Sequence, residues 1–365
     1  MIATASVLSR YIGRNFLLHF LVMMLVMLGL VFIFDTIELL RRASTHEGVT
    51  FDVVTTMAFL KLPDAGQTMI PFGVLFGAIY TCWKLNKTHE LMVIRSAGIS
   101  AWQFLGPIVA AAVLIGVCAT AVINPVSSVF FGKYERMERN YLKTNDDLVT
   151  VSRTGIWLRQ PLAAGYALIH SEGFSKAEWR LSKALILSFD DQDNFQQRID
   201  SPLVYLKEGH WDIRSALVND KAGETRRLDT LQIPTALTAR KIEESFADPE
   251  TISFWQIPEY IHIMEETGFP ATRLDIYFQS LLAKPFLLAA LVLLAATFSL
   301  RPPRFGGTAL MIALGVATGF LIFFMESMLH AFGISQKIPV ILAAWTPAVI
   351  GLLAGVTALL HLEDG

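Results

Sequence analysis

Long apolar runs with short polar connections occupy both ends of this chain, while its middle is polar and interrupted. A helix needs roughly 20 mostly apolar residues to cross the hydrocarbon core of a bilayer. Six runs reach that length, so we expect six membrane-spanning helices. They cover residues 16–37, 57–83, 101–123, 276–300, 308–328 and 338–360.

Several polar residues indicate where these runs begin, bend or end. The second run contains Pro63 and Pro71, and because a proline removes a helix hydrogen bond we expect this helix to bend. Ser100 is a suitable N-cap for the third run, and Asn124-Pro125 is expected to end it. The sequence RPPRFGG after the fourth run predicts a turn.

The polar middle of the chain follows another period. Segments such as WRLSKALILSF and SPLVYLKEGHWDI alternate approximately between apolar and polar positions, and Gly, Asn, Asp and Pro separate them. This pattern is typical of short β-strands. We therefore predict a polytopic α-helical membrane protein, with transmembrane regions at 1–125 and 274–365. Residues 126–273 are expected to form an inserted extracytoplasmic β-jelly-roll domain and a helical return segment.

Composition agrees with this division. The chain is 53% hydrophobic and only 17% charged, and its mean hydropathy is +0.48, too apolar for an ordinary soluble globule. A net charge of -2 gives no indication of nucleic-acid binding, which needs clustered Lys and Arg. The two cysteines, Cys82 and Cys118, both lie in apolar segments and suggest no disulfide framework.

The basic residues predict an orientation. Seven lie before the first run or in the connections after the second and fourth runs, against three in the opposite short connections. The positive-inside rule then places both termini in the cytoplasm and the β domain outside it. The seven are Arg10, Arg14, Lys84, Lys87, Arg95, Arg301 and Arg304; the three are Arg41, Arg42 and Lys337.

Motifs for catalysis are missing from the sequence. We find no GxSxG, HExxH or paired-cysteine spacing, and His170 and His210 stand alone in the β region, so we predict no catalytic residues, metal or cofactor. The chain also lacks GxxxxGK[ST], the phosphate-binding loop of many ATPases. The chain is therefore not expected to hydrolyse ATP itself by a P-loop mechanism.

Two short motifs and the order of domains carry a resemblance to a known family. The motifs are RYIGRNF at residues 10–16 and HELMVIRSAGIS at residues 89–100. Together with three spans, a β domain and three more spans, they resemble the LptF/LptG permeases of the bacterial lipopolysaccharide exporter, more closely LptG. The resemblance covers nearly the whole chain.

This resemblance implies a function and a set of partners. In the family, two permeases, LptF-like and LptG-like, pair with a dimer of a cytoplasmic LptB-like ATPase in the inner membrane. They extract lipopolysaccharide and pass it to a periplasmic bridge of LptC-like and LptA-like jelly rolls. Two other interpretations of the chain remain: a permease for another anionic glycolipid, or a membrane-anchored scaffold whose β domain docks partners.

The segment at 88–98 is the expected contact with the ATPase. Leu91, Ile94 and Gly98 recur at helical spacing and would form an apolar stripe, and Gly98 is a natural helix end. Glu90, on which the family match falls, and Arg95 would make charged contacts at the rim of an ATPase groove. The alternative is a helix that rests on the lipid interface.

Charged residues near the outer ends of two spans are the expected lipid contacts. Asp35, Glu38 and Arg42 fall on roughly one helix face beside Arg41, and guanidinium groups bind phosphate well. These four residues could instead form only internal ion pairs. The resemblance to LptG implies a lysine where this chain has Asp35, so either the inner contact with an anionic lipid differs here or the lipid itself differs.

Glu326 is an acid inside the fifth span. Such residues usually face protein or a water-filled cavity. We expect it to pair with Lys61 or Arg42, or to reach the interface.

Overall fold

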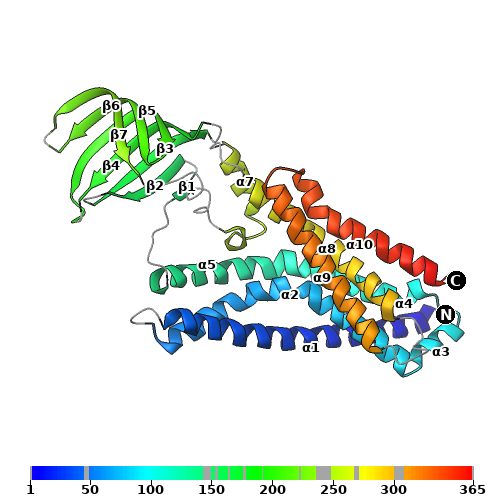
Figure 1. The fold of residues 1–365 in the computed structure, drawn as a ribbon. Coiled ribbons are helices and arrows are strands. Elements are labelled where there is room, and N and C mark those ends of the chain that lie inside the picture. Colours follow the sequence, from blue (N-terminus) through cyan, green and yellow to red (C-terminus); the bar gives the residue numbers. More distant parts are fainter. Residues whose placement is uncertain are drawn as a thin grey trace. The chain divides into compact units, whose positions relative to one another are not determined.

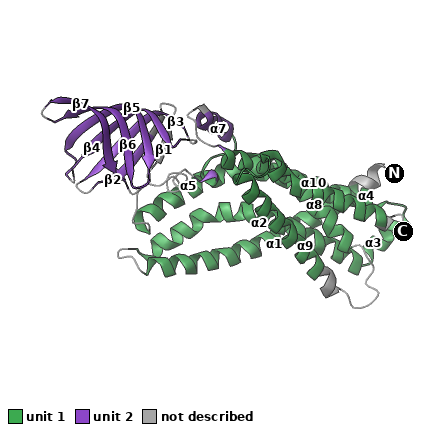
Figure 2. Ribbon diagram, turned by 45° about the horizontal axis from the view of Figure 1, so that its top comes forward, with its two compact units in different colours: residues 1–142, 250–255, 272–365 green, residues 143–249, 256–271 purple. Residues whose placement is uncertain are grey.

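The computed structural model of the chain forms two compact units (Figure 2). One unit contains residues 1–142, 250–255 and 272–365, and the other contains residues 143–249 and 256–271. The structure describes residues 2–44, 49–142, 149–152, 155–162, 165–175, 178–190, 192–221, 223–235, 248–266, 271–299 and 308–363. The predicted turn RPPRFGG lies outside the described residues.

The first unit is helical. Within the part of the chain that the structure describes, six helical segments are long and apolar enough to cross a membrane, which confirms the predicted number of spans. The helices, labelled in Figure 1, are α1 (Ile2–Ala43), α2 (Phe51–Lys87), α3 (Glu90–Ser96), α4 (Ala101–Cys118), α5 (Asn124–Tyr141), α8 (Thr272–Ser299), α9 (Thr308–Ile334) and α10 (Val340–Glu363). A π-helical turn, η1 (Ala119–Ile123), joins α4 to α5.

Helix α8 lies at the centre of this bundle and packs against α2, α4, α9 and α10. In its most apolar stretch 72% of the residues are buried, against 17% for both α1 and α9. Helices α4 and α8 approach closely at Gly116, where an added Cβ would lie 2.6 Å from the Cα of Pro285. The outer helices α1 and α9 therefore keep large apolar faces uncovered by the chain itself.

The third span is longer than the sequence suggests. Asn124-Pro125 was expected to end it, but the chain passes through η1 directly into α5, so this expectation was wrong. A π-helical turn breaks the regular hydrogen-bond ladder just before Pro125, which stands in the first turn of α5, where a missing N–H costs little. Pro63 and Pro71 likewise lie inside the continuous helix α2.

The described residues of the second unit form a seven-stranded antiparallel sheet, which confirms the inserted β domain. Its described strands pair in sequence order, whereas a Greek-key jelly roll pairs distant strands. They are β1 (Val149–Ser152), β2 (Gly155–Pro161), β3 (Tyr166–Ser175), β4 (Arg180–Phe189), β5 (Phe195–Lys207), β6 (His210–Asp220) and β7 (Thr225–Pro234). The predicted helical return segment contains η2 (Pro249–Thr251), at the boundary between the two units, and α7 (Ile257–Glu266), which belongs to the second unit.

The core of the β unit is apolar with one buried polar network. Alternate residues of the central strands, such as Ile186, Ile199 and Ile213, are fully buried. Trp211 donates its indole N–H to the Gln160 side-chain oxygen at 2.7 Å, and Thr235 donates to the same oxygen at 2.8 Å. The buried Trp211 and Thr235 donors thus share one acceptor, as burial of polar groups requires.

Candidate functional site

The short helix α3 connects α2 to α4, and local backbone geometry fixes both of its ends. His89 precedes the helix with a left-handed φ of 60°, and Gly98 follows it with a φ of +78°. The N–H of Ile99 bonds to the carbonyl of Ile94, and the N–H of Gly98 bonds to that of Arg95. This is a Schellman motif, which explains why the helix ends at the glycine.

The apolar stripe expected to meet the ATPase faces the opposite way. Leu91 and Ile94 are 6% and 8% exposed, and they belong to the core of the helical unit. The two residues between them, Met92 and Val93, are 68% and 66% exposed. Because positions three apart share one helix face, burying Leu91 and Ile94 turns Met92 and Val93 outward. Sequence periodicity located the helix but assigned its free surface to the wrong pair.

The two sequence motifs that carried the resemblance meet at Glu90. Tyr11, in the RYIGRNF motif, donates its hydroxyl to Glu90 Oε2 at 3.0 Å, and Thr88 donates to Oε1 at 2.9 Å. Ile12 and Phe16 of the same motif are completely buried. The first motif therefore holds the second in place, so Glu90 has partners within the chain as well as a partly open surface.

The charged residues at the end of α1 form a paired cluster. Glu38 accepts from Arg41 Nη2 at 2.7 Å and from Arg42 Nε at 3.0 Å, and Arg42 also reaches Glu138 of α5 at 3.3 Å. Asp35 pairs with Lys61 of α2 at 3.0 Å. The internal pairing considered from the sequence is thus formed, while the Arg41 side chain stays 73% exposed.

Glu326 faces a partner that was not anticipated. Lys61 and Arg42 are paired with Asp35, Glu38 and Glu138, so neither expected pairing with Glu326 is formed in the described part of the chain. Instead Glu326 lines a cavity together with Lys284 of α8, without an ion pair within 4.0 Å in the described part of the chain. A lysine within the fourth apolar run was the signal that could have revealed this group, because intramembrane charges are seldom incidental.

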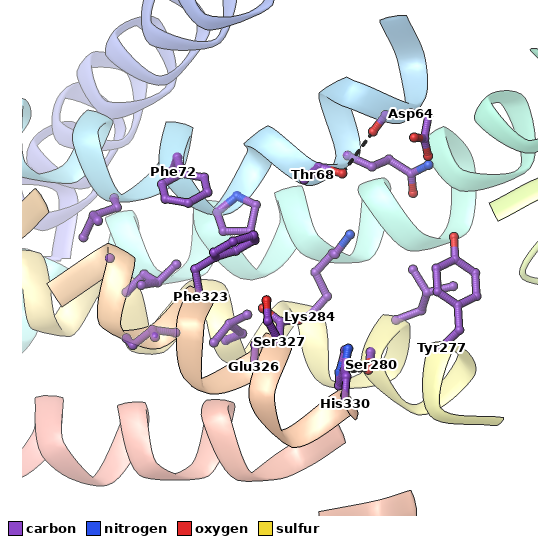
Figure 3. A pocket seen from close by; sticks show the side chains of 18 of the residues that line it. Asp64, Thr68, Phe72, Tyr277, Ser280, Lys284, Phe323, Glu326, Ser327 and His330 are labelled. Atoms are coloured by element: carbon purple, nitrogen blue, oxygen red, sulfur yellow. Dashed lines mark hydrogen bonds between the residues drawn. The ribbon is translucent and has the colours of Figure 1, made fainter. Parts of the chain in front are cut away.

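Lys284 and Glu326 line a cavity of about 360 Å³ between α2, α8 and α9 (Figure 3). One part of the lining is polar and contains Asp64, Gln67, Tyr277, Ser280, Lys284, Glu326 and His330. The rest is apolar and contains Phe72, Leu75, Leu287, Leu291, Ile322 and Phe323. The cavity is therefore amphipathic, with its charges on all three helices.

Helices α2 and α9 touch at the apolar end of the cavity. Gly319 and Gly315 of α9 lie against the side chains of Leu75 and Ile79 of α2, with no room for a Cβ. One turn farther on, the Phe72 ring lies 5.6 Å from that of Phe323 and 6.0 Å from that of Phe320, between ring centroids. Among the described residues there is no cluster of three or more potential metal ligands.

Comparisons with known proteins agree on one family. The family model described as lipopolysaccharide export system permease LptF/LptG matches residues 10–361. The lipopolysaccharide export system permease protein LptG of Haemophilus influenzae is 24% identical, with 94% of this chain and 96% of that protein covered. The protein of the same name from Escherichia coli K12 is 21% identical, with 94% and 95% covered.

Proposed function

The chain belongs to the LptF/LptG family of lipopolysaccharide export permeases, and on that premise we propose that it works as one half of a paired permease driven by a separate cytoplasmic ATPase. It is a multi-pass inner-membrane protein and a transport component rather than an enzyme. Its substrate in this proposal is lipopolysaccharide, taken from the membrane and passed through periplasmic jelly-roll proteins.

The observation that carries the proposal is the construction of α3. Leu91 and Ile94 fix the helix to the bundle, while Met92 and Val93 offer two apolar side chains to a partner. Burying an apolar side chain of this size contributes about 1.5–3 kcal/mol. A helix that is anchored on one face and free on the other can transmit the movement of an ATPase to α2 and α4, which it connects.

Charge supports placing α3 in the cytoplasm. Arg10 and Arg14 on α1, Lys84 and Lys87 on α2, and Arg95 on α3 are all exposed. The contact between Tyr11 and Glu90 brings these segments to one end of the bundle. By the positive-inside rule, that end of the bundle and the N-terminus are cytoplasmic. Because the number of spans is even, the C-terminus is cytoplasmic as well. The β unit then lies in the periplasm, where it meets the bridge.

The lipid route in this proposal runs along α1 and α9. Their apolar faces are the least covered of the six spans, so they suit lipid entry or contact with the second permease. Arg41 is the best-placed residue for contact with a lipid phosphate. Its guanidinium forms an ion pair with Glu38, but its side chain is still exposed. The Asp35–Lys61 pair neutralises the position where the family has a lysine.

The test is co-purification of the cytoplasmic ATPase with variants of α3 in the assembled complex. Met92→Arg and Val93→Arg place a charge on the proposed contact and should each reduce bound ATPase at least tenfold, by the loss of an apolar contact. Met92→Leu keeps the apolar surface and is the matched control. Undiminished ATPase binding in both arginine variants would refute the contact.

A further inference from the structure

The amphipathic cavity between α2, α8 and α9 contains a buried polar atom and a lysine that the described residues leave without a close partner. Gln67 is 5% exposed, and its side-chain oxygen has no hydrogen-bond partner among the described residues. Lys284, which is half-buried, forms no ion pair within 4.0 Å among the same residues, although Asp64 and Glu326 line the same cavity. Buried polar groups are normally paired, so the Gln67 oxygen, with the ammonium of Lys284 in the same cavity, indicates a ligand.

The charges around Lys284 restrict what this ligand can carry. Asp64 on α2 and Glu326 on α9 both line the cavity, and Glu250 adds a third carboxylate that has other interactions in the chain. A purely anionic headgroup would meet Lys284 but be repelled by the acids. A purely cationic group would leave the ammonium unpaired. A headgroup with a phosphate and a protonated amine can satisfy both signs, and its N–H groups can also bond to Gln67.

The apolar end and the volume indicate an acyl chain. Leu75, Leu287 and Leu291 are buried where they line this end. The cavity, at about 360 Å³, is near the lower limit for small-molecule sites, so it suits one chain rather than several. Thr68 of α2 and Ser327 of α9 are exposed although they line the cavity, so it opens between these helices.

We infer that this cavity is a binding site for a membrane phospholipid with an aminoethyl-phosphate headgroup, as in phosphatidylethanolamine. Its phosphate bonds to Lys284, its amine lies between Asp64, Glu326 and the Gln67 oxygen, and one acyl chain occupies the apolar end. The second chain stays in the bilayer through the opening between α2 and α9. The inference rests on the proposed function only for the membrane location of these helices, since a resident phospholipid is distinct from the exported substrate.

The experiment measures lipid occupancy rather than export, so its failure is distinguishable from failure of the proposed function. The full complex is reconstituted in nanodiscs containing equal amounts of phosphatidylethanolamine, phosphatidylcholine and phosphatidylglycerol. Lipids retained after extraction into detergent are then identified by native mass spectrometry. The variants are Lys284→Met, Glu326→Gln and the control Lys133→Met, which changes an exposed lysine of α5. Methionine is close in size to lysine and removes only its charge, so folding is expected to be kept.

We expect the wild type and Lys133→Met to retain phosphatidylethanolamine in preference to the other two lipids. Lys284→Met should reduce its retention about tenfold, since a charge-assisted hydrogen bond is lost. Glu326→Gln should reduce the preference over phosphatidylcholine, whose quaternary amine cannot donate a hydrogen bond. Equal retention of the three lipids, unchanged retention in Lys284→Met, or occupancy by the exported glycolipid alone would overturn the inference.

Discussion

The hydrogen bond between Tyr11 and Glu90 allows a quantitative test of how α3 is held. If Glu90 acts mainly by fixing α3, removing the Tyr11 hydroxyl should weaken ATPase binding although Tyr11 itself need not touch the ATPase. A hydrogen bond to a charged group contributes about 1.5–3 kcal/mol, but Tyr11 is 46% exposed and water competes. We therefore expect Tyr11→Phe to weaken ATPase binding by about 1 kcal/mol, which lowers the affinity about fivefold.

A double-mutant cycle separates the two possible roles of Glu90. The dissociation constant of the ATPase is measured for the wild type, Tyr11→Phe, Glu90→Ala and the double variant, each reconstituted in nanodiscs. We expect Tyr11→Phe to have almost no effect once Glu90 is alanine, because its partner is gone. Tyr80→Phe is the control, since Tyr80 contacts His19 and Trp83 through its ring. An equal effect of Tyr11→Phe in both backgrounds would refute the positioning role.

Three further predictions concern the packing and pairing that support the site. Gly116→Ala should lower the free energy of unfolding by about 1–3 kcal/mol, because the new methyl meets the Pro285 backbone. The control Gly106→Ala should not lower it, because a Cβ there meets nothing within 4 Å. Thermal unfolding in detergent measures both variants. Gln160→Leu should lower the free energy of unfolding of the β unit by about 2–5 kcal/mol, because two donors lose their buried acceptor. Unchanged protease resistance of the β unit would argue against this. Lys61→Met should destabilise the protein by about 1–3 kcal/mol, because it leaves the Asp35 carboxylate unpaired. Adding Asp35→Leu to this variant should restore much of the lost stability. Equal melting temperatures of the wild type, the single variant and the double variant would contradict the pairing.

Hydrophobic periodicity predicted most of the fold because each span buries or exposes a continuous apolar surface. It failed at Asn124-Pro125, since a π-helical turn accommodates the proline without ending the helix. It also could not decide which face of α3 is free. Both Leu91 with Ile94 and Met92 with Val93 are apolar pairs, and only the packing of Leu91 and Ile94 into the core separates them.

The charged groups were harder to predict than the spans. Arg41, Arg42 and Glu38 are close in sequence, so their helical spacing correctly indicated internal pairing. The partners of Asp35 and Glu326 lie on other helices, and helix spacing carries no information about them. Lys284 is a single charged residue in a run that is otherwise long and apolar enough to span the membrane, so the run alone does not indicate its role.

The most direct test of the central claim, that a separate ATPase drives this permease through α3, is site-specific photocrosslinking in the native membrane. A photoreactive amino acid is placed at Met92, at Val93 or, as control, at Leu25, an exposed position in the middle of α1. We expect the cytoplasmic ATPase to be crosslinked from positions 92 and 93 and not from position 25. Absence of the ATPase at both α3 positions, or its equal capture from position 25, would contradict the claim.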